Sequence, residues 1–66
     1  MPPNTRGKIK EHLEGVHRNT EGIKSHCNKI TELVGDKNMK VTMAVTKLQE
    51  VNNILDEFAM NLYGSI

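Results

Sequence analysis

The sequence predicts an all-α protein, an antiparallel two-helix hairpin with heptad seams that dimerises into a four-helix bundle. Apolar residues recur at alternating spacings of three and four through both halves of the chain, which is the heptad pattern of packed helices. Gly35 and a few polar residues interrupt this pattern once, near the middle. The second half also carries more apolar residues than one neighbouring helix covers. We expect a single domain over residues 1–66.

The first helix is expected over residues 5–34. Asn4 or Thr5 is suited to cap it, because either side chain can accept a hydrogen bond from an early backbone N–H. Two heptad positions, labelled a and d, form its seam, and the other positions follow in heptad order. The residues at position a are Leu13, Thr20, Cys27 and Val34, and those at position d are Ile9, Val16, Ile23 and Ile30.

A turn over residues 35–37 is expected to join this helix to a second one over residues 38–63. Gly35 stands where a helix commonly ends on a left-handed residue. Asp36 or Asn38 is expected to cap the second helix, and Gly64 to end it. So short a connection folds the helices back antiparallel. The a and d seam of the second helix consists of Val41, Ala44, Leu48, Val51, Leu55, Phe58 and Leu62.

Folding about this turn places residue i of the first helix opposite roughly residue 73 − i of the second. Val16 is thereby expected near Phe58, and Thr20 near Asn52 and Asn53. A polar layer inside an apolar seam lowers stability but disfavours slipped registers. Alternatively, the Thr20 hydroxyl bonds to the backbone carbonyl four residues earlier.

The second helix carries apolar residues beyond its seam, with Val45 and Ala59 at position e and Ile54 at position g. The narrow seam of the first helix cannot cover so wide a stripe. We therefore expect the surplus to meet the second helix of another copy, which makes a homodimeric four-helix bundle. A chain of 66 residues with one cysteine also has no disulfide to compensate for a small core.

Composition excludes several classes of protein. A net charge of +1 is too weak to drive nonspecific binding to nucleic acids or membranes. No apolar run exceeds three residues, which excludes a transmembrane helix and a signal peptide, and we expect no membrane partner. The lone cysteine excludes a disulfide framework and suits a reducing compartment. We expect a cytoplasmic protein.

The sequence also contains no recognisable catalytic or metal-binding motif. His12 and His17 are five residues apart and point about 140° apart around a helix, so they do not form a metal-binding pair. Cys27, at a seam position, is typical of a small core residue. No nucleophile is spaced with a base, and no glycine-rich loop follows a strand. The prediction is a non-enzyme without metal or cofactor.

Two surfaces are candidates for binding an unidentified protein partner. Gly15 and Gly22 lie one heptad apart and form, with Arg18, an open notch on the outer face of the first helix. Met39 and Met43 supply flexible apolar side chains near the turn. The alternative for the glycines is an outer helix face that tolerates them without any binding role. The alternative for the methionines is that they cover the turn end of the bundle. The favoured interpretation is a small dimeric regulator, inhibitor or adaptor of a larger protein or assembly.

A basic edge supports an alternative function. Lys10, His17 and Lys24 recur every seven residues at position e, and Arg6 extends the row. If the first helices of two copies lie side by side in a dimer, their basic edges form one surface suited to bind phosphate groups. In length and architecture the chain is similar to the Rop family of plasmid copy-number regulators, short hairpins that dimerise into a four-helix bundle and bind paired RNA loops. That resemblance implies a dimeric RNA- or DNA-binding regulator. The other explanation of the basic edge is solvated charge that flanks the seam. A third function considered for the chain is that of a purely structural assembly element.

Overall fold

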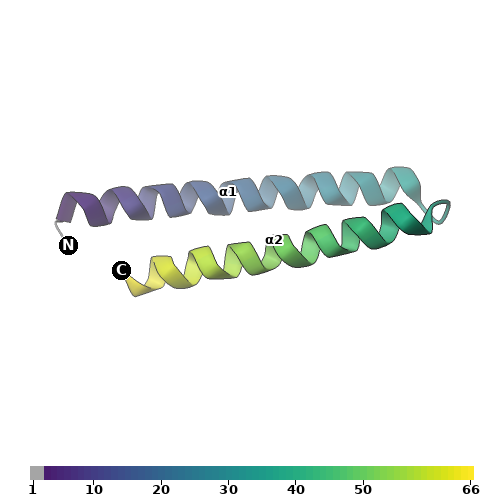
Figure 1. Cartoon of the computed structure of the whole chain (residues 1–66). Helices are drawn as coiled ribbons and strands as arrows, with labels where there is room; N and C mark the ends of the chain where they lie inside the picture. Colours follow the sequence, from purple (N-terminus) through teal and green to yellow (C-terminus); the bar gives the residue numbers. More distant parts are fainter. Residues whose placement is uncertain (1–2) are drawn as a thin grey trace.

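The structure, a computed structural model, describes residues 3–66 and consists of two helices (Figure 1). Helix α1 spans Pro3–Val34 and helix α2 spans Met39–Ser65. They lie side by side and antiparallel, so that both ends of the chain lie at one end of the molecule (Figure 1). The predicted all-α hairpin is therefore confirmed. Residues 1 and 2 of the predicted 1–66 domain lie outside the described residues.

Helix α1 is continuous through Gly7, Gly15 and Gly22, although each glycine inside a helix costs roughly 1 kcal/mol relative to alanine. Its N-terminus differs from the sequence prediction. Asn4 and Thr5 lie inside the first turn of the helix instead of capping it, because the helix already begins at Pro3. Proline is favoured in a first helical turn, where its missing N–H costs no hydrogen bond.

The turn between the helices is built as predicted. Gly35 has a φ of +57°, and its N–H donates to the Thr31 carbonyl at 3.0 Å. The Lys37 N–H donates to the Val34 carbonyl at 3.2 Å. A left-handed glycine therefore ends α1, a conformation that other residues adopt only at a cost.

Of the two predicted caps for α2, the residue that caps the helix is Asn38. Its backbone is extended, with φ −144°, and its side-chain Oδ1 accepts a hydrogen bond from the Val41 N–H at 3.2 Å. The expected stop at Gly64 is wrong, because α2 continues through it to Ser65. The Ser65 hydroxyl donates to the Asn61 carbonyl at 2.8 Å within this last turn.

The core lies along position a of α1 and position e of α2. Among the side chains described, over residues 4–66, the buried ones are Thr20, Cys27, Val45, Asn52 and Ala59. The Asn52 Nδ2 donates to the Thr20 carbonyl at 2.9 Å, so residue i of α1 lies opposite roughly residue 72 − i of α2. The predicted polar layer at Thr20 is therefore present.

Helix α2 is rotated about its axis relative to the sequence prediction. Its a and d seam was expected to face α1, with Phe58 near Val16, but Phe58 is 72% exposed. Position e, with Val45, Asn52 and Ala59, faces α1 instead. The physical reason is twofold: the small residues at this position allow close approach, and the rotation gives the polar side chains of α1 partners on α2.

The molecule is a thin rod with little interior. It measures 53 × 15 × 12 Å and has a radius of gyration of 15.5 Å, whereas a compact domain of this length has about 11 Å. Two of its five buried described residues are polar. The hairpin alone therefore removes little apolar surface from water.

We expect Gly35→Ala and Gly22→Ala to change stability in opposite directions. Alanine at Gly35 is strained by the positive φ and should lower the free energy of unfolding by about 1 kcal/mol. A Cβ added at Gly22 meets nothing within 4 Å, so alanine there should raise it by about 1 kcal/mol. Thermal or urea unfolding followed by circular dichroism checks both changes. If the free energy of unfolding changes in the same direction in both variants, the assigned turn is contradicted.

Candidate protein-binding face

One flank of the hairpin is closed by polar contacts between α1 and α2. The His17 Nδ1 lies 2.7 Å from the Asp56 Oδ1 and donates to it. The Thr20 hydroxyl lies 2.8 Å from the same Asp56 oxygen and 2.8 Å from the His17 carbonyl, so its single hydrogen is shared between two acceptors. With the bond from Asn52 to the Thr20 backbone, this cluster ties the helices together at mid-length.

The same flank continues toward both ends of the rod. The Tyr63 hydroxyl donates to the Glu14 carboxylate at 3.0 Å, and the Lys10 Nζ lies 4.9 Å from the centroid of the Tyr63 ring. Nearer the turn, the Gln49 Nε2 donates to the Asn28 Oδ1 at 3.3 Å. Position e of α1 and its polar neighbours thus meet position b of α2 along most of this polar flank.

The polar contacts shift three pKa values. The hydrogen bond to Asp56 and that carboxylate's charge raise the pKa of His17 above its ordinary value of 6.5, and Glu21 adds to the effect. Hydrogen bonds from His17 and Thr20 lower the pKa of Asp56 below 3.8. The hydrogen bond to Glu14 raises the pKa of Tyr63.

The predicted basic edge coincides with this polar flank. Lys10 lies over an aromatic ring, and His17 pairs with Asp56. The charge of Lys24 contributes to the lowered pKa of the same aspartate, while Arg6 is exposed. The edge therefore has mixed charge in the folded hairpin, and two of its four members contact α2.

The opposite flank is apolar and uncovered. Because positions e and b of α2 turn toward α1, its positions a and d turn to the other side, where position d of α1 also lies. We call this surface the open face; its residues are Ile9, Val16, Ile23 and Ile30 of α1 and Val41, Ala44, Leu48, Val51, Leu55, Phe58 and Leu62 of α2. From Leu48 to Leu62 each of its large side chains on α2 is about half exposed or more.

The open face is continuous along the rod. Its exposed residues on α2 recur at spacings of three and four from Leu48 to Leu62, so they form an unbroken row. Single exposed apolar residues are ordinary, but a contiguous row on two adjacent helices marks a contact surface. Ile54, at position g, is also exposed and widens the row.

Two more apolar features lie outside the hairpin core. Leu33, near the turn on α1, is 85% exposed, the highest value among the large apolar side chains described. Toward the other end of α1 lies an open groove of about 290 Å³, which overlaps the open face at Ile9 and Val16 and is also lined by Thr5, Lys8, His12 and Leu13. Neither feature has a role within a single hairpin.

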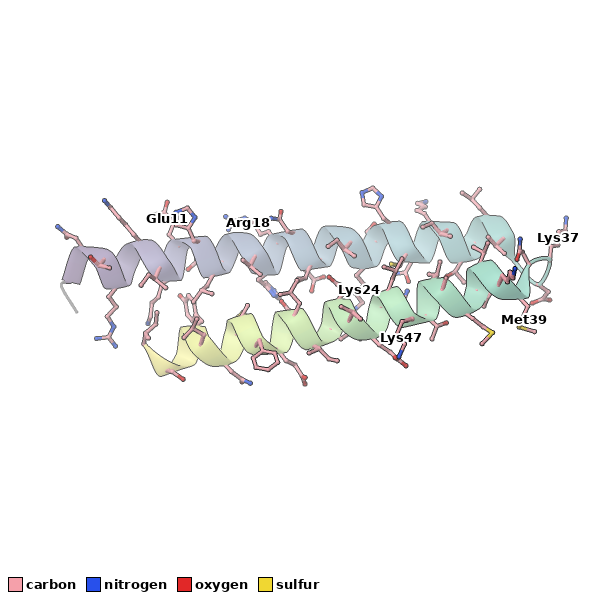
Figure 2. The ribbon with its side chains drawn as sticks, in the orientation of Figure 1. Glu11, Arg18, Lys24, Lys37, Met39 and Lys47 are labelled. Carbon is pink, nitrogen blue, oxygen red and sulfur yellow. The ribbon has the colours of Figure 1, made fainter. Side chains whose placement is uncertain are left out.

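The two surfaces predicted to bind a partner are both accessible. An added Cβ at Gly15 would meet only the end of the Arg18 side chain at 3.7 Å, and one at Gly22 meets nothing within 4 Å. The glycine notch on α1 is thus open, with no backbone approaching it. Met39 and Met43 are exposed, and Figure 2 shows the Met39 side chain beside the turn, on the side opposite to Lys37. The binding roles of these residues stay predictions.

Sequence reasoning missed Asp56 and Tyr63 as structural partners, although the signal was present. The 73 − i relation places residue 56 opposite His17 and residue 63 opposite Lys10, which are the contacts observed. Cys27 is buried, as expected for a seam residue. Thr20 belongs to the polar layer through its hydroxyl, which bonds to Asp56, and through its backbone carbonyl. The same hydroxyl also bonds to the carbonyl three residues back, and not to the one four residues back that the alternative expected.

Within residues 3–66, no three His, Cys, Asp or Glu residues are grouped to hold a metal ion. Neither described helix is both long and apolar enough to cross a membrane. No protein-family model, curated protein or solved structure matches the chain. Among the described residues, the surface most suited to a partner is the open face, because its large apolar side chains are exposed.

The His17–Asp56 pair predicts a stability that depends on pH in both directions. Because the folded pKa of His17 is raised, its contribution is complete below pH 6.5 and is lost as the pH rises through the folded value. Because the folded pKa of Asp56 is lowered, its contribution is present above pH 3.8 and is lost as the pH falls through the folded value. The pair therefore stabilises most between these limits.

The measurement is the thermal midpoint against pH at one fixed protein concentration. His17→Gln should remove the part of the decline above pH 6.5 that the natural chain shows. His26→Gln, at an exposed position, is the matched control and should keep that decline. Identical profiles for both variants would contradict the assigned pair.

Proposed function

We propose that this chain is a small non-catalytic protein-binding module whose open face docks against another polypeptide, and that it acts as a regulator, inhibitor or adaptor of a larger protein or assembly. The supporting observation is the asymmetry of the two flanks. One flank is closed by hydrogen bonds between α1 and α2, whereas the other leaves a continuous apolar row in solvent. We also propose a cytoplasmic location, since the chain has a single cysteine, which is free and buried.

The energetics favour occupation of the open face. Full burial of a Leu, Val or Phe side chain is worth about 1.5–3 kcal/mol, and five large residues of α2 on this face are about half exposed or more. Covering them would add several kcal/mol to a rod whose own interior is thin. Polar side chains at Lys40, Lys47 and Asn61 border the face, as in a protein interface with an apolar centre and a polar rim.

The basic edge supports nucleic-acid binding less well. Lys10 and His17 already contact α2, and the carboxylates of Glu14 and Asp56 lie among the cations of the edge. These negative charges would oppose a phosphate backbone. A structural assembly element would use the same open face as a regulator, so the experiment below bears on both.

Site-specific photocrosslinking in the cell tests whether the open face binds protein. A benzophenone amino acid in place of Leu55 samples the centre of the face, and the same residue in place of Asn53 samples the exposed opposite side of α2. We expect a protein adduct, of this chain or another, from position 55 but not from position 53. Equal labelling at both positions, or none at either, would overturn the proposed function.

A further inference from the structure

We infer that the occupant of the open face is a second copy of this chain, docked antiparallel through α2 about a twofold axis at Val51, with Leu33 of each copy seated in the apolar groove of the other. This inference rests on the proposed function, which requires only that the face binds protein. Five observations carry it: the faces left open by each helix, the sizes of the side chains around Val51, the charges at the border, the placement of Leu33, and the thinness of the core.

The first observation is which helix needs a second neighbour. In α2, position e faces α1, and position a lies next to it on the side of the open face. Position d lies further round the helix, away from α1. Val51 and Phe58 at position d are therefore left for another helix. In α1 the residues beyond position d are mostly polar, with His12, Asn19 and His26 at position g and Leu33 as the apolar exception. The added helix therefore packs beside α2.

The second observation is size complementarity about Val51. Ala44 and Phe58, the smallest and the largest apolar residues at position d, lie seven residues to either side of it. An antiparallel pairing of two α2 helices centred there sets Phe58 of each copy against Ala44 of the other, and Val51 against itself. A parallel pairing would instead crowd two phenylalanines and leave a void between two alanines.

The third observation is the charge along the border of the paired helices. In the antiparallel register, Lys47 of one copy lies near Ile54 of the other, and Lys40 lies near Asn61. No like charges meet at position g, and the aliphatic stem of Lys47 can cover the exposed Ile54.

The fourth observation is the match between Leu33 and the groove on α1. Since residue i of α1 lies opposite roughly residue 72 − i of α2, Val51 is level with Glu21. A twofold axis at that level sets residue i of one α1 level with residue 42 − i of the other, which places Leu33 at Ile9. Leu33 is at position g, on the side of α1 that would turn toward the second α1. Ile9 lies in the open groove of about 290 Å³.

Leu33 and the groove, neither of which has a role in a single hairpin, therefore lie at the same level of the dimer. This level follows from the twofold axis at Val51 alone. The pairing also supplies the interior that the rod lacks. Position a of α2 and position d of α1 from both copies enclose a common core, the arrangement of a four-helix bundle. For a 66-residue chain whose described residues contain no disulfide and no cluster suited to hold a metal ion, association with itself is a common route to sufficient burial.

Light scattering and cysteine crosslinking of the full chain test the inference together. We expect a mass of about twice 7.4 kDa. Oxidation should link Val51→Cys to itself, Ala44→Cys to Phe58→Cys in a mixture, and the two copies of a chain that carries Ile9→Cys with Leu33→Cys. The natural chain is the control, because its Cys27 is buried and should not crosslink.

A matched pair of alanine variants measures the contribution of Leu33. Leu33→Ala should raise the dimer dissociation constant roughly tenfold or more, because the side chain is exposed in the hairpin and buried only in the dimer. Met60→Ala, at position f of α2, is also exposed but outside the proposed contact and should leave the constant unchanged.

Every other outcome overturns the second-copy inference. Self-crosslinking of Ala44→Cys would indicate a parallel pair, and equal effects of the two alanine variants would remove Leu33 from the contact. A chain that stays monomeric over the whole concentration range would leave the face for a different protein. That last result leaves the proposed function standing if position 55 still gives a photocrosslinked adduct, and only loss of the adduct refutes both.

Discussion

The hydrogen bond from Asn52 to the backbone of Thr20 fixes how the two helices meet, and the rest of the structure depends on it. The Asn52 side chain is buried, and among the described residues its Oδ1 has no hydrogen-bond partner. An unsatisfied buried oxygen costs about 1–3 kcal/mol. A slip of one heptad would separate the Thr20 hydroxyl from Asp56 and set Asn52 against Cys27 or Leu13, so the layer lowers stability while it selects one register.

The rotation of α2 follows from the same layer. With Asn52 turned to α1, Asp56 reaches His17 and Thr20, and Tyr63 reaches Glu14. The leucines, valines and phenylalanine of the a and d seam are then carried round to the other flank. Positions e and b of α2 therefore hold the hairpin together, and positions a and d stay largely uncovered.

The sequence was sufficient for the elements and for the register. Spacings of three and four specify helices, Gly35 specifies the reversal, and the 73 − i relation places Asp56 opposite His17. It did not determine the rotation of α2. A heptad pattern shows that a wide apolar stripe exists, and its period is the same whichever part of the stripe faces α1. That choice depends on pairs distant in sequence, such as Asn52 with Thr20, whose joint effect appears only in three dimensions.

In the proposed function, an open apolar face on a thin rod couples folding to binding. Whatever covers the face binds the folded hairpin and not the unfolded chain, so its concentration adds to the apparent stability by mass action. The polar layer strengthens this coupling, because it selects one arrangement of the helices without adding much apolar burial. Residues such as Leu48 and Phe58 then contribute little to the isolated hairpin and most of their burial energy to the complex. The fraction of the chain that is folded and the fraction of open faces that are covered therefore rise and fall together.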